Sequence, residues 1–270
     1  MMPGIGVGIS PMLSRFRGGY GVYTTAWYTQ VLANGGTATA GELSALTVFE
    51  TADAANLLLD DRLVFPSMQN SIAAKVSFVN PNSTIATWVN SPTHTAGQGV
   101  QGNAATNYIN TNYNPFVDGV NFTQDSASFF MYNNILNSSA GSHGVYTLTP
   151  DKYLLLYSAG ATALRPSIND NDIPLSSTKT NETGLIGMIR TNSTTKYSNV
   201  DGSDSTAITR TSTGLPNGNI FLLARNQNKG GAGEFQNNRI CVYSFGSSAI
   251  NRPLRYSNLQ ALGTTLGWAV

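Results

Sequence analysis

Charged side chains are scarce in this chain of 270 residues. Lysine, arginine, aspartate and glutamate together make up 11% of it, against roughly 25% in an average soluble domain. Asn, Ser, Thr and Gly take their place, so the predicted surface is polar and nearly neutral. A formal net charge of +1 gives no field that would attract a polyanion, which argues against nucleic acid as a partner. Such a surface suits a protein outside the cytosol or one packed into an assembly.

Cysteine and long apolar runs are scarce as well. Cys241 is the single cysteine, which excludes an intrachain disulfide framework. Its place in the apolar run RICVYSF predicts a small buried side chain. No run approaches the roughly 20 apolar residues of a membrane span, and we expect no membrane partner. In the first residues, MMPGIGVGISPMLSRFRGGYG, the arginines follow the apolar patch, whereas in a signal peptide the positive charges precede it. We therefore expect the protein to be released by lysis of the cell or built into a particle.

The remaining pattern divides the chain into three parts. Residues 1–22 are Gly-rich and are predicted to form an extended arm. Two interpretations of this arm stay open: it becomes ordered against a neighbouring subunit, or it is a loose terminus. Residues 23–65 are predicted to be a helical lead segment, because apolar residues such as Leu43 and Leu46 recur at spacings near three and four. Residues 66–270 are predicted to form one β-sandwich domain.

Short segments rich in β-branched and aromatic residues begin at about residue 72. Clusters of Asn, Asp, Gly and Pro separate them, and no helix between them is long enough for a crossover. The segments are AKVSFVN, TIATWVN, TNYINTNY, ASFFMYN, GVYTLT, KYLLLYS, GLIGMIR, TAITR, NIFLLAR and RICVYSF. This spacing predicts a mainly β fold, an antiparallel sandwich.

The last residues return to a helical spacing. Asn251 is placed to cap a short C-terminal helix, and Pro253 fits its first turn. Four leucines are expected on one face of this helix: Leu254, Leu259, Leu262 and Leu266.

Several blocks resemble laminin-G-like, or concanavalin-A-like, jelly-roll domains. The block from STGLPNGNIFLLARNQNKGG to the closing helix is similar to the end of that fold, with a strand, a Gly-rich loop, a last strand and a helix. GMIRTNSTTKYSNVDGS looks like the strand pair before it, and GQGVQGNAATNYINTNYNP looks like an early strand. With the start GIGVGISP and the helical lead, the chain resembles structural proteins of tailed bacteriophages. The resemblance implies a jelly-roll sandwich in a virion protein.

Acid–base catalysis has few candidate residues. A glycoside hydrolase needs two carboxylates flanking the scissile bond, and related glucanases carry an E-x-D-x-E pattern. The four glutamates form no such motif: Glu42, Glu50, Glu182 and Glu234. His94 and His143 lie in turns without a second zinc ligand nearby. We therefore expect no enzyme, and structural roles for both histidines.

Calcium is the cofactor that the acidic residues could hold. Asp170 and Asp172 lie in SINDNDIPL, and Asp201 and Asp204 lie in NVDGSDS. Their oxygen ligands suit calcium, but neither stretch has the spaced loop with a distal glutamate. Turn chemistry is the favoured interpretation, so the prediction is no cofactor, with calcium at these four aspartates as the alternative.

Sugar binding fits the stretch Tyr108–Asn134, which is rich in aromatic rings and side-chain amides and has Asp118 and Asp125 as its charged residues. Sugars are bound by rings stacked on their CH faces and by amide hydrogen bonds to their hydroxyls. Four rings are candidates for such a platform: Trp88, Tyr113, Tyr132 and Tyr197. Because successive side chains of a strand point to opposite faces, the alternative for each of these rings is a place in the core.

The sequence thus predicts a non-enzymatic protein exposed on a bacteriophage virion, with other virion proteins as partners and a homo-oligomer, a trimer, as its state. Two functions compete: a fibre or adhesin component that binds host-surface glycans, and a decoration (cement) protein that contacts only virion proteins. A glycoside hydrolase is a distant third.

Overall fold

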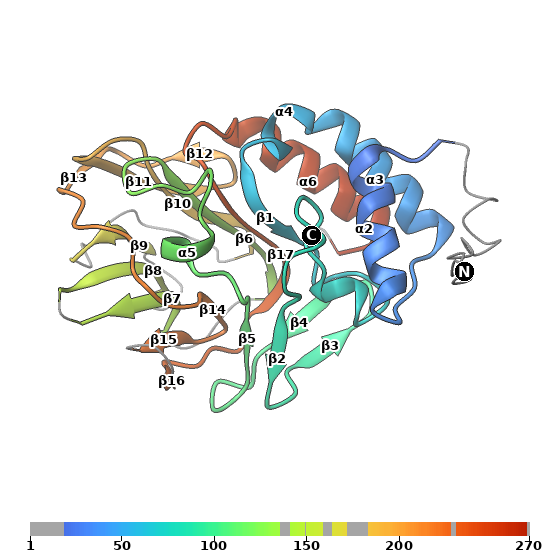
Figure 1. Cartoon of the computed structure of the whole chain (residues 1–270), viewed down its shortest axis with the longest axis horizontal. Helices are drawn as coiled ribbons and strands as arrows, with labels where there is room; N and C mark the ends of the chain where they lie inside the picture. The colour runs from blue at the N-terminus through green and yellow to red at the C-terminus, as the bar shows by residue number, and fades with distance from the viewer. Residues whose placement is uncertain are drawn as a thin grey trace, which may run out of the picture.

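The computed structural model describes residues 19–135, 141–148, 150–158, 164–171, 183–227 and 231–268. It is a two-layered β-sandwich with helices against one of its faces (Figure 1). The predicted fold class is confirmed: the chain is mainly β, with short helical segments near both ends.

Sheet A has nine strands within the described residues and forms the middle layer. Its main path runs β12-β11-β10-β6-β17-β4-β3, with β1 paired to β17 and β13 paired to β11. The strands are β1 (Asp60–Val64), β3 (Thr93–Thr95), β4 (Gly99–Gln101), β6 (Ala127–Ile135), β10 (Gly184–Arg190), β11 (Thr195–Val200), β12 (Ser203–Asp204), β13 (Ile208–Thr209) and β17 (Arg239–Gly246). All its pairings are antiparallel.

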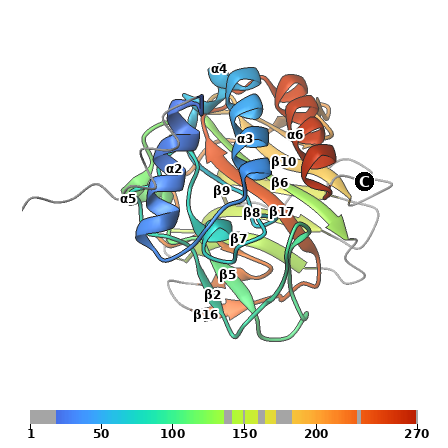
Figure 2. The same cartoon turned by 90° about the vertical axis from the view of Figure 1, so that its right-hand side faces the viewer.

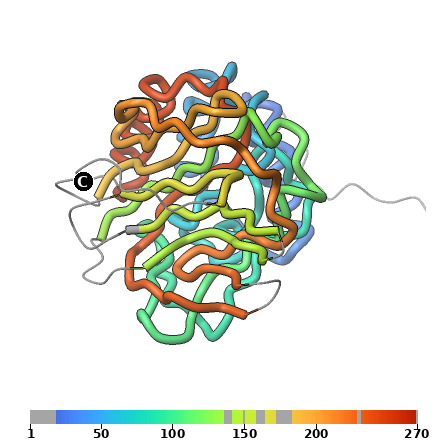
Figure 3. Tube along the Cα trace, turned by 90° about the vertical axis from the view of Figure 1, so that its left-hand side faces the viewer, coloured from blue at the N-terminus to red at the C-terminus, as the bar shows by residue number. Residues whose placement is uncertain are grey.

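Sheet B has eight strands within the described residues and forms the outer layer (Figure 3). Its path runs β16-β15-β7-β14-β5-β2, extended by β8 and β9 beside β7. The strands are β2 (Thr87–Val89), β5 (Tyr108–Asn110), β7 (Gly141–Thr147), β8 (Lys152–Ser158), β9 (Leu164–Asp170), β14 (Phe221–Leu222), β15 (Arg225–Gln227) and β16 (Gly231–Gly233). One pairing, β15 with β7, is parallel.

The helices cover the face of sheet A that points away from sheet B (Figure 2). They are α2 (Val22–Ala33), α3 (Ala40–Ala52), α4 (Ala54–Leu57) and α6 (Arg252–Leu266), while η1 (Ala73–Lys75) and α5 (Pro115–Asp118) are single turns in connections. Thr39 and Glu42 form a capping box at the start of α3, and the Glu50 carboxylate accepts hydrogen bonds from the first amides of α2. The predicted cap of α6 is confirmed, with Asn251 Oδ1 accepting from Leu254 N at 3.2 Å.

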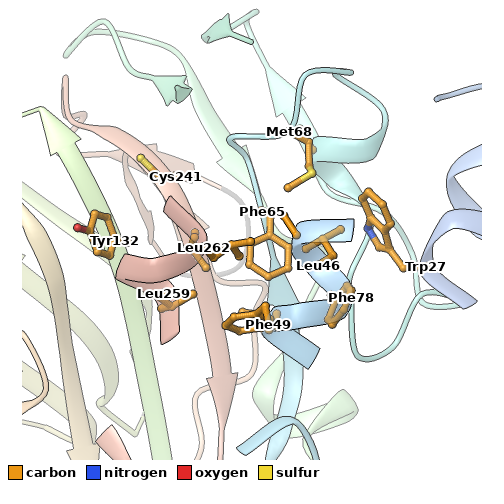
Figure 4. Close-up of a cluster of buried hydrophobic side chains, with 14 of the residues drawn as sticks. Trp27, Leu46, Phe49, Phe65, Met68, Phe78, Tyr132, Cys241, Leu259 and Leu262 are labelled. Carbon is orange, nitrogen blue, oxygen red and sulfur yellow. The ribbon is translucent and has the colours of Figure 1, made fainter. Parts of the chain in front are cut away.

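Alternation along the strands of sheet A divides the interior into two cores. In β6, Phe129 and Met131 point into the core between the sheets, whereas Phe130 and Tyr132 point into the core under the helices. The helical core is drawn in Figure 4, where Phe49 of α3 packs with side chains of sheet A and α6. The helices therefore belong to the same folded unit as the sandwich.

Several local expectations differ from the structure. The helical lead ends at Leu57, and Asp60–Val64 is strand β1, because it completes the edge of sheet A beside β17. AKVSFVN is not a strand: it starts in the single turn η1 and makes one bridge, between Ser77 and Val64. Leu254 does not share the buried face of α6 and is exposed.

Candidate functional site

Two of the four predicted platform residues lie in the core. Tyr132 is buried under the helices, where its ring meets Trp268 edge to face at 4.9 Å between centroids. Tyr113 is 1% exposed and its ring stacks on Phe245 at 5.2 Å. Its hydroxyl donates to Asp61 Oδ2 at 2.8 Å. Neither ring offers a face on which a sugar can stack.

The other two predicted rings are half-buried but lie in different sheets. Trp88 is in β2 of sheet B, and the Lys75 ammonium lies 4.3 Å from its ring centroid. Tyr197 is in β11 of sheet A, opposite Ile189. The structure therefore does not bring the four predicted rings together into one platform.

The predicted calcium ligands have protein partners wherever the structure describes them. Asp170 is buried and accepts from Arg190 Nη2 at 2.7 Å and from Lys196 Nζ at 2.6 Å. Asp204 pairs with Arg252 at 2.7 Å, and Asp201 Oδ1 accepts from the Leu185 amide. Asp172 lies outside the described residues.

No three acidic, histidine or cysteine side chains gather as a metal-binding group within the described part of the chain. Asp170 already faces two cations, and Asp204 faces one. These partners support turn and packing roles for the acids rather than a shared ion.

The two histidines are held in structural contacts. His143 is 1% exposed, and its Nδ1 accepts from the Leu223 amide at 2.9 Å. Burial lowers its pKa to about 3, so the ring is neutral. His94 Nε2 donates to the Met68 carbonyl at 3.0 Å, and burial lowers its pKa too.

A groove on sheet B has the composition that sugar binding requires. Its volume is about 410 Å³, and none of the described residues that line it is charged. The lining residues, here called the Asn-rich groove, are Tyr108, Asn110, Asn114, Asn217, Gly218, Asn219, Phe221 and Asn226. The volume lies within the range of small-molecule sites, roughly 300–1,000 Å³.

The aromatic side of the groove is a fixed cluster. Tyr108 is half-buried in β5, with its ring centroid 4.5 Å from that of Phe221 and 6.3 Å from that of Phe235. Phe221 lies on the neighbouring strand β14. Because both neighbours are aromatic, Tyr108 keeps one orientation and presents a rigid apolar surface beside the amides.

The amide side of the groove is oriented by hydrogen bonds that leave donors available. Asn114 Nδ2 donates to Asn217 Oδ1 at 2.9 Å, and Asn110 Oδ1 accepts from the Asn112 amide at 3.0 Å. Among the described residues, the Nδ2 groups of Asn110 and Asn217 have no acceptor. Asn110 and Asn217 therefore each have one end fixed and one end able to bind hydroxyl groups, whereas both ends of the Asn114 amide are held.

The inner wall of the groove is also amide. Asn226 is 2% exposed, and its Nδ2 donates to the Asn219 carbonyl at 2.8 Å. Its Oδ1 has no partner within the part of the chain that the structure describes. Gly218 lies against Asn226 and Val145, where an added Cβ would make tight contacts. A larger residue at Gly218 would thus disturb this wall.

The predicted stretch supplies Tyr108 and Asn110 to the Asn-rich groove, whereas its tyrosines chosen from the sequence, Tyr113 and Tyr132, are buried. Tyr108 and Asn110 have the period of two that puts both on one face of β5, with Ile109 buried between them. That alternation was visible in the sequence. Tyr113 turns inward because the chain bends after β5 at Asn112, which has a φ of +51°, and no sequence pattern predicts that bend.

No family model and no curated protein matches the chain. Among solved structures, it is similar to the ligand-binding domain of botulinum neurotoxin serotype D in complex with N-acetylneuraminic acid. The identity is 10% and the TM-score 0.50, over 77% of this chain and 52% of that one.

Two further structures are more distant. A mutant of Trypanosoma rangeli sialidase with trans-sialidase activity has 9% identity and a TM-score of 0.48, over 83% of this chain and 39% of that one. Domain 4 of AbnA, an extracellular arabinanase from Geobacillus stearothermophilus, in complex with arabinotriose, has 12% identity and a TM-score of 0.40, over 73% and 97%. This chain spans about two fifths of the sialidase. At these identities the likeness shows the β-sandwich fold alone.

No helix in the described residues is long and apolar enough to cross a membrane.

Proposed function

We propose that this protein is a non-enzymatic glycan-binding protein whose Asn-rich groove binds a neutral sugar unit. One observation carries the proposal: a fixed aromatic pair and five asparagines line one groove, and no described residue of its lining is charged. The ring of Tyr108 supplies an apolar face, and the amides supply donors and acceptors for hydroxyl groups. The N-acetylneuraminic acid complex of the neurotoxin domain with the same fold agrees with such a role for this sandwich.

The partners of the glutamates support the proposal of binding without turnover. Glu42 caps α3, Glu50 holds the start of α2, and Glu234 pairs with Arg225 at 2.8 Å. Glu182 lies outside the described residues. Among the described residues that line the Asn-rich groove there is no carboxylate pair of the kind that hydrolysis of a glycosidic bond requires.

The biological setting is proposed from the sequence resemblance alone. In this proposed setting, the protein is exposed on a bacteriophage virion as an oligomeric fibre or adhesin component and binds host-surface glycans. A decoration protein that contacts only virion proteins is the alternative, and it needs no sugar in the groove.

A glycan microarray of bacterial surface polysaccharides and neutral oligosaccharides tests the proposal. We expect the full chain to bind a neutral glycan, and Tyr108→Ala to weaken that binding by about tenfold, a loss of roughly 1.4 kcal/mol. Tyr197→Ala is the matched control, because Tyr197 is a half-buried tyrosine on the other sheet, and it should bind as the wild type does. Binding that survives Tyr108→Ala unchanged, or no binding to any glycan, would contradict the proposal.

A further inference from the structure

Arg62 is a buried cation without a hydrogen-bond partner. It lies in β1, is 6% exposed, and its guanidinium makes no hydrogen bond or ion pair with any residue that the structure describes. Its Cζ lies 5.8 Å from the ring centroid of Tyr113. Burial lowers the pKa of Arg62 from its ordinary value, and an arginine starts so high that it stays charged at neutral pH. A buried charge of this kind calls for an explanation.

The other buried arginines show what this protein does with such a group when its role is structural. Arg190 donates to Asp170 and to four carbonyls. Arg255 lies 2.6 Å from Asp53 and 2.7 Å from Asp60. Arg62 differs from both, because it lines a cavity and forms no ion pair with a described residue.

The neighbouring Asp61 makes no ion pair with Arg62, because four hydrogen bonds hold its carboxylate elsewhere. Its Oδ1 accepts from the Asn121 amide at 2.8 Å. Its Oδ2 accepts from the amides of Val120 and Phe122 and from the Tyr113 hydroxyl at 2.8–3.0 Å. The charges of Asp61 and Asp118 still attract the guanidinium at longer range.

The cavity around Arg62 has a volume of about 310 Å³ and a polar lining. This Arg62 cavity is lined by Asp61, Arg62, Asn80, Asn82, Ser83, Thr84, Asn112, Tyr113 and Asp118. Asp118 is exposed at its rim and makes no ion pair with Arg62. The cavity therefore combines one forked cation with amides, hydroxyls and a carboxylate acceptor.

That combination selects a class of ligand. A guanidinium binds a carboxylate through two parallel hydrogen bonds. The amides, the hydroxyls and Asp118 suit a ligand with many hydroxyl groups. Asp61 and Asp118 share the cavity and repel any anion, so a phosphate dianion fits less well than a carboxylate, whose single charge the pairing with Arg62 has to hold against that repulsion.

We propose that the Arg62 cavity binds the carboxylate of an acidic sugar, a uronic acid unit of the glycan that the Asn-rich groove binds. This inference rests on the proposed function. The segment 110–118 lines both sites: Asn110 and Asn114 face the groove, and Asn112 and Tyr113 face the cavity. One oligosaccharide lying across this segment reaches both.

Nuclear magnetic resonance of the full chain with ¹⁵N-labelled arginine tests the inference. The Nε–Hε signal of Arg62 is identified by its absence in Arg62→Met. D-glucuronate, D-glucose and acetate are the three probes, each added at the same concentrations. We expect glucuronate to shift the Arg62 signal with an affinity at least about tenfold above that of glucose or acetate. Arg252→Met, which removes a partly exposed arginine elsewhere, should leave that shift unchanged.

The melting temperature of Arg62→Met separates binding from a structural role. Because Arg62 forms no hydrogen bond or ion pair with a described residue and the substitution relieves its desolvation, the variant should melt at the wild-type temperature or above it, despite the lost contact with Tyr113. A lower melting temperature, an unmoved Arg62 signal, or an equal shift with acetate would overturn the inference. A shift by glucuronate in a protein that binds no neutral glycan would keep the carboxylate site and refute the proposed role of the groove.

Discussion

The guanidinium of Arg255, on α6, lies 2.7 Å from the carboxylate of Asp60, on β1, and both side chains are almost completely buried. The same guanidinium lies 2.6 Å from Asp53, which ends α3. One arginine near the C-terminus therefore joins the closing helix to the helical segment and to the edge strand of sheet A.

Removing the arginine of this group leaves two carboxylates buried without their cation. We expect Arg255→Met to lower the free energy of unfolding by about 3–5 kcal/mol, measured by urea denaturation. Asp204→Asn is the control, because the Asp204–Arg252 pair is partly exposed and should cost at most about 1 kcal/mol. Equal losses in the two variants would show that the buried group does not join the helices to the sheet.

A second buried ion group, on β9, β10 and β11, places two cations against one carboxylate oxygen. Asp170 Oδ2 accepts from both Arg190 and Lys196. Asp170→Asn should therefore destabilise the fold by about 3–5 kcal/mol. Adding Lys196→Met to that variant should recover part of the loss, because it removes one of the two neighbouring cations that Asp170 faces. No recovery in the double variant, by urea denaturation, would contradict this account.

His143 predicts how stability depends on pH. Its pKa is about 3 in the folded protein, because burial disfavours the charged ring, and about 6.5 when unfolded. Between these values only the unfolded chain binds the proton. The free energy of unfolding therefore decreases as the pH falls from about 6.5 towards 3, by up to about 1.4 kcal/mol per pH unit.

The comparison that isolates this effect is His143→Asn, whose amide oxygen can accept from the Leu223 amide in place of Nδ1. We expect the stability difference between wild type and variant to shrink steadily from pH 6.5 to pH 4 in urea titrations. A difference that is independent of pH would mean that His143 is protonated in the fold.

Tyr132 and Tyr108 should show opposite behaviour. Tyr132 packs against Trp268 in the core, so Tyr132→Leu should lower the melting temperature while leaving glycan binding by the folded fraction unchanged. Tyr108→Ala should weaken binding with little loss of stability, because its ring is only half-buried. Melting curves and array binding of the two variants check both. If a folded Tyr132→Leu variant lost glycan binding, Tyr132 would belong to the binding site, as the sequence analysis predicted.

The N-terminal arm gives a test of assembly. Residues 1–18 lie outside the described residues, and the virion proposal assigns them to docking against a neighbouring subunit. Deleting them should leave the melting temperature unchanged and convert the oligomer, a trimer, into monomers by light scattering. If the deletion variant kept the oligomeric mass of the wild type, the docking surface would have to lie on the helical lead segment instead.

The sequence by itself determined the elements whose signal is local. The two-residue period of ASFFMYN predicted β6, and Asn251 with Pro253 predicted the start of α6. The scarcity of charge and the amides of the stretch Tyr108–Asn134 pointed to a neutral surface that suits sugars. These predictions need only propensity and spacing, because caps and strand alternation act over a few residues.

Only the tertiary structure decided which face of each strand is covered. Phe129 and Phe130 are chemically alike, yet one faces sheet B and the other faces the helices. Tyr108 and Tyr113 are both tyrosines of one stretch, and the bend at Asn112 leaves the first half-exposed and buries the second. Asp61 and Arg62, adjacent in sequence, acquire a saturated carboxylate and an unpartnered guanidinium because of loops about 60 residues away. Burial and pairing depend on contacts between distant segments, and no local pattern records them.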